Sequence, residues 1–261
     1  MTIAATDPSG GAGLQADLKT FAALQVYGLS AITAVIAQNS AHVERVEAVD
    51  PGLVFAQIET VVAERLPDAL KTGALVSAAV IRTVIRALDK LSLPAPVVDP
   101  VLVSSSGTRL LEPAGERLLR TEIIPRARLI TPNIPEAEVL TGIEIDSAAA
   151  MRRAAEMLRS CSAAAVLIKG GHWQEISDGR QSRVVDLLFD GQRFVEFTAL
   201  RVPGDGAHGT GCALSAAIAA WLARGVEMEP AIRRAKLFLT RALQNAFAFG
   251  NGRRVLDHFV N

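Results

Sequence analysis

Cysteine is scarce in this sequence of 261 residues, which contains only Cys161 and Cys212. Two cysteines cannot form the disulfide framework of a small secreted protein, and such low cysteine content is typical of a reducing compartment. The N-terminal segment also lacks a basic region followed by an apolar one, the pattern of a secretory signal. These two absences together predict a cytoplasmic protein.

Excess charge of either sign is missing as well, because 27 acidic residues balance 27 basic ones. Without a basic cluster, the sequence has no electrostatic footprint for nucleic acid or for an anionic membrane surface. No apolar run reaches the roughly 18 to 20 residues that a transmembrane helix needs. We therefore expect a small-molecule partner, with no nucleic acid and no membrane.

Two familiar nucleotide-binding motifs are absent or out of context. No Gly-x-x-x-x-Gly-Lys-[Ser/Thr] string occurs, which excludes a Walker P-loop. Gly204-x-Gly206-x-x-Gly209 matches the dinucleotide fingerprint, but that fingerprint needs a helix that leads into a second parallel strand. Here one helical pattern leads into another, so an NAD-dependent oxidoreductase is disfavoured.

Apolar, β-branched segments alternate with helical patterns along most of the chain. Strands are expected at residues 30–37, 96–103, 128–133 and 164–171, and helices at 14–25, 51–66, 77–90, 112–122, 146–160, 209–223 and 229–248. This alternation predicts a mostly parallel sheet with helices on both faces. Asp190-Gly191, between two further apolar segments, predicts a type I′ turn and an antiparallel hairpin at the sheet edge. With no repeat and no linker, residues 1–261 are expected to form one α/β domain.

Polar side chains occur where three of the apolar strands end. Asp99, Asn133 and Lys169 follow successive strands, and the carboxyl ends of parallel strands are where ligands bind in such sheets. Each residue also has an ordinary structural interpretation, as a turn residue, a helix cap and a solvated strand end respectively. The three together favour a site for Mg²⁺ and phosphate, with Asp ordering the metal and Lys neutralising phosphate oxygens.

The Asn133-Ile134-Pro135-Glu136 segment has two interpretations that the sequence leaves open. Asn133 can cap the following helix, and Glu136 in its first turn interacts favourably with the helix dipole. The same oxygens can instead face the water shell of a Mg²⁺ ion.

Four small residues, Gly209-Thr210-Gly211-Cys212, open a long apolar helix. Unpaired N–H groups and the helix dipole favour an anion there, and glycines allow a phosphoryl group to approach the backbone. The dipole is also expected to lower the pKa of the Cys212 thiol, which would make Cys212 a base or a nucleophile. The alternatives are an ordinary helix start and a small buried hydrophobic residue. His208 and His172, which follow glycine-rich turns, are either ligand contacts or plain loop residues.

A second glycine-rich segment, Asp7-Pro8-Ser9-Gly10-Gly11-Ala12-Gly13, opens the first helix and lets a ligand contact backbone. Gln38-Asn39 follows a strand and is suited to hydrogen bonding with the edge of a polar ring. Both segments can also be read as plain βα loops.

These residues carry a resemblance to a known family. The segments TDPSGGAGLQADLKTF, YG…ITAVIAQN, KTG, VVDPV, ITPNIPEAEVL, KGGH and HGTGC occur in order over nearly the whole chain. Together they resemble the hydroxymethylpyrimidine/phosphomethylpyrimidine kinases of thiamine biosynthesis, members of the ribokinase-like superfamily. The pair HGTGC and DPSGGAG is the most specific part of this match.

The resemblance implies a ribokinase-like three-layer sandwich, a homodimer, and a kinase that uses ATP and Mg²⁺. It would phosphorylate 4-amino-5-hydroxymethyl-2-methylpyrimidine and then the resulting monophosphate. The family's site residues map here onto Gln38 at the aminopyrimidine edge; Ala12, Asp17, Ile36 and Val101 around the ring; Gly209, Thr210, Gly211 and Cys212 at the transferring phosphoryl group; Lys169 at phosphate; and Asp99, Asn133 and Glu136 near the metal. Cys212 stands where most ribokinase-like sugar kinases have an aspartate base.

Three departures from the family pattern bear on specificity. Ala5 stands where glycine is usual, Ala74 stands where methionine is usual, and residues 202–207 replace a polar lead-in to HGTGC. A roomier ring pocket would suit a pyridoxal kinase, which also phosphorylates a hydroxymethyl group on an aromatic heterocycle. A non-catalytic ligand-binding protein on the same scaffold is the alternative from a different class.

Overall fold

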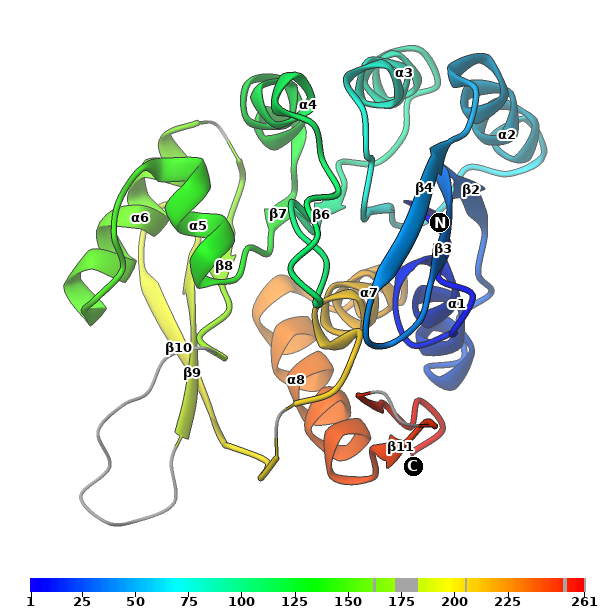
Figure 1. Cartoon of the computed structure of the whole chain (residues 1–261). Coiled ribbons are helices and arrows are strands. Elements are labelled where there is room, and N and C mark those ends of the chain that lie inside the picture. The colour runs from blue at the N-terminus through cyan, green and yellow to red at the C-terminus, as the bar shows by residue number, and fades with distance from the viewer. Residues whose placement is uncertain (162, 172–182, 205, 251–252, 261) are drawn as a thin grey trace.

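The computed structural model describes residues 1–161, 163–171, 183–204, 206–250 and 253–260. Its main sheet has eight strands in the order β10-β9-β8-β7-β6-β5-β1-β2 (Figure 1). The bounds are β1 Thr2–Ala4, β2 Ser30–Ile32, β5 Lys71–Thr72, β6 Val97–Val98, β7 Leu129–Ile130, β8 Val166–Ile168, β9 Arg183–Phe189 and β10 Phe194–Leu200. Six neighbouring strands of this sheet, β2, β1, β5, β6, β7 and β8, are parallel, whereas β9 is antiparallel to both β8 and β10. The mostly parallel sheet with an antiparallel edge hairpin is confirmed.

Helices cover both faces of this sheet and complete three layers (Figure 1). One face carries α1 (Gly13–Ala23), α7 (Thr210–Ala223) and α8 (Met228–Gln244). The other carries α2 (Pro51–Glu64), α3 (Ala78–Lys90), α4 (Pro113–Leu118), α5 (Ile134–Thr141) and α6 (Ala148–Ser160). None of the described helices is both long and apolar enough to span a membrane.

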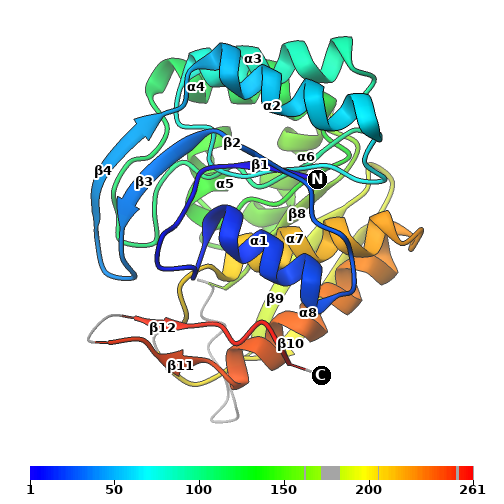
Figure 2. The same ribbon diagram turned by 90° about the vertical axis from the view of Figure 1, so that its right-hand side faces the viewer.

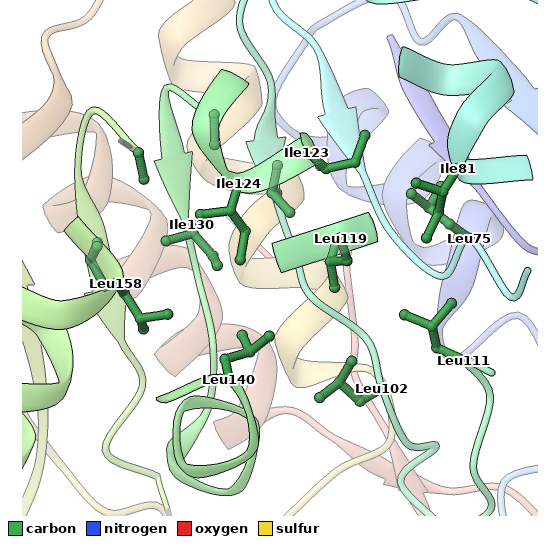
Figure 3. Packing of buried hydrophobic residues seen from close by; sticks show 14 of the residues in the cluster. Leu75, Ile81, Leu102, Leu111, Leu119, Ile123, Ile124, Ile130, Leu140 and Leu158 are labelled. Atoms are coloured by element: carbon green, nitrogen blue, oxygen red, sulfur yellow. The ribbon is translucent and has the colours of Figure 1, made fainter. Parts of the chain in front are cut away.

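Alternation along each central strand explains why the sheet buries both faces. Val98 and Ile130 belong to the core on the α2–α6 side, whereas Val97 and Leu129 belong to the core on the α1, α7 and α8 side. Figure 3 shows the first of these cores, where Ile130 and Leu158 lie among leucine and isoleucine side chains from several elements. Each such fully buried side chain contributes about 1.5–3 kcal/mol by leaving water.

The expected strand at 30–37 is wrong as a single element, because it belongs to two sheets. β2 ends at Ile32, and β3 (Ala34–Gln38) pairs with β4 (Val43–Ala48) in a small antiparallel sheet that projects from the main one (Figure 2). The chain turns at Thr33, whose N–H donates to Ala4 O and whose hydroxyl donates to Ala74 O. Both pieces bury apolar side chains, so hydrophobicity alone could not locate the break.

Other boundaries differ because the chain leaves the sheet early to build loops. The strands expected at 96–103, 128–133 and 164–171 pair over only two or three residues each. The helix expected at 112–122 ends at Leu118 and continues as a π turn and a 3-10 turn to Arg126. The helix expected at 229–248 ends at Gln244, and the short strands β11 (Phe247–Ala248) and β12 (Arg254–Val255) follow it.

The edge hairpin is present, but its turn is not the expected type I′. Phe189 pairs with Phe194, so four residues connect the strands. Gly191 has a φ of 93°, while Asp190 does not have positive φ and instead accepts hydrogen bonds from the N–H groups of Gln192 and Arg193. The short carboxylate side chain therefore closes the turn in place of a tight two-residue loop.

Candidate active site

A cavity of about 770 Å³ opens at the carboxyl ends of the parallel strands. All but one of the site residues predicted from the sequence line it. These are Ala12, Ile36, Gln38, Asp99, Val101, Asn133, Glu136, Lys169, Gly209, Thr210, Gly211 and Cys212. The exception is Asp17, which is fully buried outside the cavity wall.

Lys169 lies between two carboxylates at the centre of this cavity. Its Nζ is 2.9 Å from Asp99 Oδ1 and 4.0 Å from Glu136 Oε2. Asn133 and Lys169 lie side by side through a parallel bridge between the ends of β7 and β8. The three polar strand ends therefore converge on one place, as expected from the sequence.

The electrostatics of this group leave one negative charge in excess only when Glu136 is ionised. Burial would lower the pKa of Lys169, but Asp99 and Glu136 hold it above its usual range, so the ammonium stays charged. Burial would raise the pKa of Asp99, but Lys169 and Lys71 hold it below its usual range. Burial raises the pKa of Glu136 to about 7, with Asp99 adding to the rise and Lys169 opposing it.

Asn133 and Glu136 form a capping box at the start of α5. The side chain of Asn133 accepts a hydrogen bond from the Glu136 N–H, and Glu136 Oε2 accepts one from the Asn133 N–H, each at 2.8 Å. Both residues nevertheless line the cavity. The capping interpretation is thus confirmed, and it holds the Glu136 carboxylate beside Lys169 and Asp99.

The α7 helix begins at the cavity without a side-chain cap. Gly209 precedes it with φ of 86°, and a Cβ there would lie 1.8 Å from the Gly11 carbonyl oxygen, so only glycine fits. Gly211 faces the Lys169–Asp99 ion pair closely, since a Cβ on it would lie 3.2 Å from Lys169 Nζ. Free helix N–H groups and a lysine ammonium therefore face the same space, an arrangement suited to a phosphoryl group.

Cys212 lies in the first turn of α7, as expected, but the expected direction of its pKa shift is wrong. Burial raises the pKa of the Cys212 thiol to about 12, although Lys71 opposes the rise. The helix dipole is therefore outweighed by the loss of solvation. In the ligand-free protein Cys212 is a neutral thiol at physiological pH.

A fully buried ion pair, between Lys71 of the cavity lining and Asp17, was missed by the sequence reasoning. Lys71 Nζ donates to both carboxylate oxygens of Asp17, at 2.8 and 2.7 Å, and the Thr2 hydroxyl donates to Asp17 Oδ2 at 2.6 Å. Asp17 raises the pKa of Lys71 above its usual range despite burial. The signal that could have found this pair is a lysine within a short buried strand, in Leu70-Lys71-Thr72-Gly73.

Ser215 was missed as well. It lies one turn after Gly211 on α7, and its hydroxyl is 3.2 Å from Asp99 Oδ2. Asp99 is therefore held from both sides, by Lys169 at one oxygen and by Ser215 at the other. The i, i+4 spacing from Gly211 on the helix predicts this placement only once the helix is known to start at Thr210.

The acceptor end of the cavity is a small apolar recess with a polar rim. Ala5, Ile36 and Val76 form a buried cluster against which Ala74 packs, and Gln38 lines the cavity from the end of β3. Ala5 and Ala74, two of the three departures from the family pattern, thus lie together at this recess. Of the remaining predicted features, His208 and most of residues 202–207 line the cavity, whereas His172 and Asp205 lie outside the described residues.

The donor set at Lys169 fits a hydrated Mg²⁺ ion better than a directly bound transition metal. In the described part of the chain, no three His, Cys, Asp or Glu side chains are grouped as metal ligands. The available groups are the carboxylates of Asp99 and Glu136, which carry one excess negative charge beside Lys169 when Glu136 is ionised. Mg²⁺ is commonly held by one or two carboxylates together with water and substrate phosphates.

Comparison with known proteins agrees with this geometry. Residues 7–257 match the family model described as phosphomethylpyrimidine kinase. The hydroxymethylpyrimidine/phosphomethylpyrimidine kinase of Bacillus subtilis is 41% identical over 260 residues, which cover 100% of this chain and 94% of that protein.

Two solved structures are similar over nearly their whole length. The phosphomethylpyrimidine kinase of Clostridium difficile has a TM-score of 0.80 at 41% identity, covering 92% of this chain and 97% of that one. The pyridoxal kinase of Bacillus subtilis, in an ADP complex, has a TM-score of 0.88 at 34% identity, covering 98% and 95%. By sequence, fold and site, the chain belongs to the phosphomethylpyrimidine kinase family.

Proposed function

We propose that the protein transfers the γ-phosphoryl group of ATP to the hydroxymethyl group of 4-amino-5-hydroxymethyl-2-methylpyrimidine, and then a second one to the monophosphate, in thiamine biosynthesis. The observation that carries this proposal is the continuity of one cavity. It joins the uncapped start of α7 and Lys169 to an apolar recess with Gln38 at its rim. The relatives named above act on this class of pyrimidine, which supports the same assignment.

Phosphoryl transfer depends mainly on positioning and charge neutralisation, and each part of the cavity supplies one of these. Gly209, Thr210, Gly211 and the Cys212 N–H would bind the oxygens of the group in transfer. Lys169 would neutralise charge on them. In the recess, Gln38 would hydrogen-bond the aminopyrimidine edge, with Ala12, Ile36 and Val101 around the ring; Asp17 would act from below, through Lys71.

Asp99, Asn133 and Glu136 would hold Mg²⁺, through water. That ion would neutralise phosphate oxygens of ATP when bound. Glu136 has a pKa of about 7 in the free protein, and a nearby cation would favour its ionised form. We therefore expect Asp99 and Glu136 to bind a cation in addition to Lys169.

A neutral thiol suits a site that must accept two different nucleophiles. The first acceptor is an uncharged alcohol, and the second is an anionic phosphate that needs no base. A fixed carboxylate at position 212 would repel the second acceptor, whereas the protonated Cys212 does not. We infer that this is why cysteine serves here.

Pyridoxal is the second candidate acceptor. The recess at Ala5 and Ala74 and the structural similarity to a pyridoxal kinase favour it.

We further propose that residues 1–261 act as one kinase domain and that the protein is a cytoplasmic homodimer. The last point is tested by light scattering of the purified protein.

Product analysis tests the proposed function directly. Incubation with hydroxymethylpyrimidine and ATP-Mg²⁺ should yield the monophosphate first and the diphosphate later, resolved by chromatography. Pyridoxal phosphorylated with a far higher kcat/KM would assign the protein to the second candidate. Absence of ATP turnover with any acceptor would instead support a ligand-binding protein.

A further inference from the structure

His208 joins three loops that line the cavity. Its Nε2 is 2.8 Å from Asp7 Oδ2, in the loop between β1 and α1, and its Nδ1 is 2.7 Å from the Ser105 hydroxyl. His208 itself directly precedes Gly209 and the start of α7. His208 and Asp7 are both buried, with 5% and 0% of their residue surface exposed.

The direction of the first hydrogen bond follows from the state of Asp7. Burial would raise the pKa of Asp7, but the hydrogen bond from His208 and others lower it to about 2, so it is an ionised acceptor. His208 Nε2 therefore donates, and in the neutral ring Nδ1 accepts from Ser105. Asp7 also accepts from the Ala12 N–H at 2.7 Å, so the carboxylate shapes its own loop as well.

Close packing holds the imidazole as firmly as the hydrogen bonds do. A Cβ on Gly11 would lie 2.7 Å from Cδ2 of His208, so the ring rests directly against the backbone of the β1–α1 loop. The His208 N–H donates to Arg254 O at 2.8 Å, which fixes the backbone behind the ring. The imidazole is thus held from several sides, and its two side-chain partners, Asp7 and Ser105, both come from distant segments of the chain.

Ser105 is at the tip of an arm, residues 101–110, that leaves the end of β6. Backbone hydrogen bonds fold the arm on itself: Ser104 N–H to Thr108 O at 2.8 Å, Gly107 N–H to Ser104 O at 2.9 Å, and Leu110 N–H to Leu102 O at 2.9 Å. Val101 to Ser105 and Leu110 line the cavity. The arm is therefore a preformed wall of the acceptor side, and its tip is tied to the phosphoryl side through His208.

We propose that Asp7, His208 and Ser105 form a positioning junction that holds the arm against the start of α7, so that the bound acceptor, and not water, receives the phosphoryl group. The proposal rests on the proposed kinase function and adds positioning residues to it. Without the junction, water would reach the γ-phosphorus and produce ADP and inorganic phosphate in place of ADP and the phosphorylated acceptor. Exclusion of water is a general requirement of such sites.

Ser105→Ala tests the junction at an exposed residue whose loss should not unfold the protein. Ser106→Ala is the matched control, because it removes a hydroxyl from the same arm that contacts Ser104 and not His208. Ser105→Thr keeps the hydroxyl and should restore the wild-type behaviour. Thermal unfolding should differ little among the four proteins.

Hydrogen exchange of the ligand-free proteins reports on the junction without any assumption about the substrate. Loss of the hydrogen bond that ties the arm to His208 should make amides of residues 102–108 exchange on the order of fivefold faster in Ser105→Ala, whereas the Ser104–Ser106 hydrogen bond lies within the arm and does not tie it to His208. Ser106→Ala and Ser105→Thr should exchange like the wild type. Unchanged exchange in Ser105→Ala, or an equal change in Ser106→Ala, would overturn the proposed junction.

The ratio of inorganic phosphate to phosphorylated pyrimidine reports on its consequence. Ser105→Ala should raise this ratio several-fold and lower kcat/KM for the acceptor on the order of fivefold, while Ser105→Thr keeps both near the wild-type values. A wild-type ratio in a variant with faster exchange would overturn the role in excluding water. If no pyrimidine is phosphorylated by the wild type, the proposed function fails while the exchange result still decides the junction.

Discussion

Two lysine–aspartate pairs lie a short distance apart in this protein, and they serve different ends. Lys71 gives two hydrogen bonds to Asp17, and neither side chain has any exposed surface. Lys169 gives one to Asp99, keeps 13% of its side chain exposed and has Glu136 as a second neighbour. Both lysines line the cavity, but the first pair is closed in the sense that each Asp17 carboxylate oxygen is bonded to Lys71, while the second is open, with a partly exposed lysine beside Gly211.

The difference shows that pairing chemistry alone does not make a functional site. A closed, buried pair is costly to break because either charge alone would be stranded in the interior. In the open pair, Lys169 has two carboxylate neighbours and is partly exposed, so a ligand can replace one of these contacts. We therefore expect changes at Lys71 to appear mainly as lost stability and changes at Lys169 mainly as lost activity.

Lys71→Met should have the largest effect of the changes considered. It leaves Asp17 buried without its cation, which should lower the free energy of unfolding by about 3–5 kcal/mol, measured by urea denaturation. The double variant Lys71→Met/Asp17→Leu should regain much of this loss. Lys90→Met, on an exposed helix end, is the matched control and should change little. A small effect of Lys71→Met would mean that the two pairs are not distinct in kind.

Lys169→Met should act on the reaction. Removal of a preorganised positive charge from the phosphoryl site should lower kcat/KM for ATP by about 10²–10³-fold, measured by a coupled assay for ADP. Its melting temperature should stay much closer to the wild type than that of Lys71→Met. Lys90→Met again serves as control. An equal loss of stability in both lysine variants would contradict the proposed division.

Glu136→Gln should reveal the excess negative charge of the open pair through pH. The folded-state pKa of about 7 lies above the usual glutamate value of 4.5, so folding binds a proton between these pH values and the wild type loses stability as pH rises through this window. The variant lacks this loss and should gain about 2 kcal/mol relative to the wild type between pH 5 and pH 8.

Urea denaturation at several pH values measures this difference, with Glu144→Gln on an exposed loop as control. Added Mg²⁺ should reduce the loss in the wild type at pH 8. A difference that does not vary with pH would show that Glu136 is already ionised in the free protein.

Cys212→Ala should have the smallest effect and should separate the two phosphorylations. We expect about a tenfold decrease in kcat for the alcohol acceptor, less than the roughly 10²–10⁴-fold typical of proton-transfer catalysis because the thiol is neutral, and a smaller decrease for the monophosphate. Equal slowing of both steps would contradict the assigned role.

In Cys161→Ser, iodoacetamide should alkylate Cys212 roughly a thousandfold more slowly at pH 8 than an ordinary thiol, because the thiolate fraction is that much smaller.

Much of the candidate site was predictable from residue order alone. Asp99, Asn133 and Lys169 each follow an apolar strand, and parallel strands bring their carboxyl ends to one edge, so their convergence followed from topology. Lys71 instead lies within β5, and its sequence context could mark it as a buried lysine but could not identify its partner. Its partner, Asp17, comes from a helix 54 residues away.

The break at Thr33 and the sign of the Cys212 pKa shift illustrate what local pattern cannot supply. Apolar residues continue on both sides of Thr33, and hydrogen bonds to distant residues such as Ala4 and Ala74 direct the chain into a second sheet. For Cys212, the helix start was visible in the sequence, but the degree of burial that outweighs the dipole was not.

Residue order was enough to predict the layered α/β class, the position of the glycine-rich helix start and the family, because these depend on periodicity and on short contiguous motifs. The packing of the folded chain was needed to show which charged pair is closed and which is open, that Cys212 is a neutral thiol, and that His208 links Asp7 to Ser105. Solvation and pairing of a charged group depend on every element packed around it, and those elements come from distant parts of the chain.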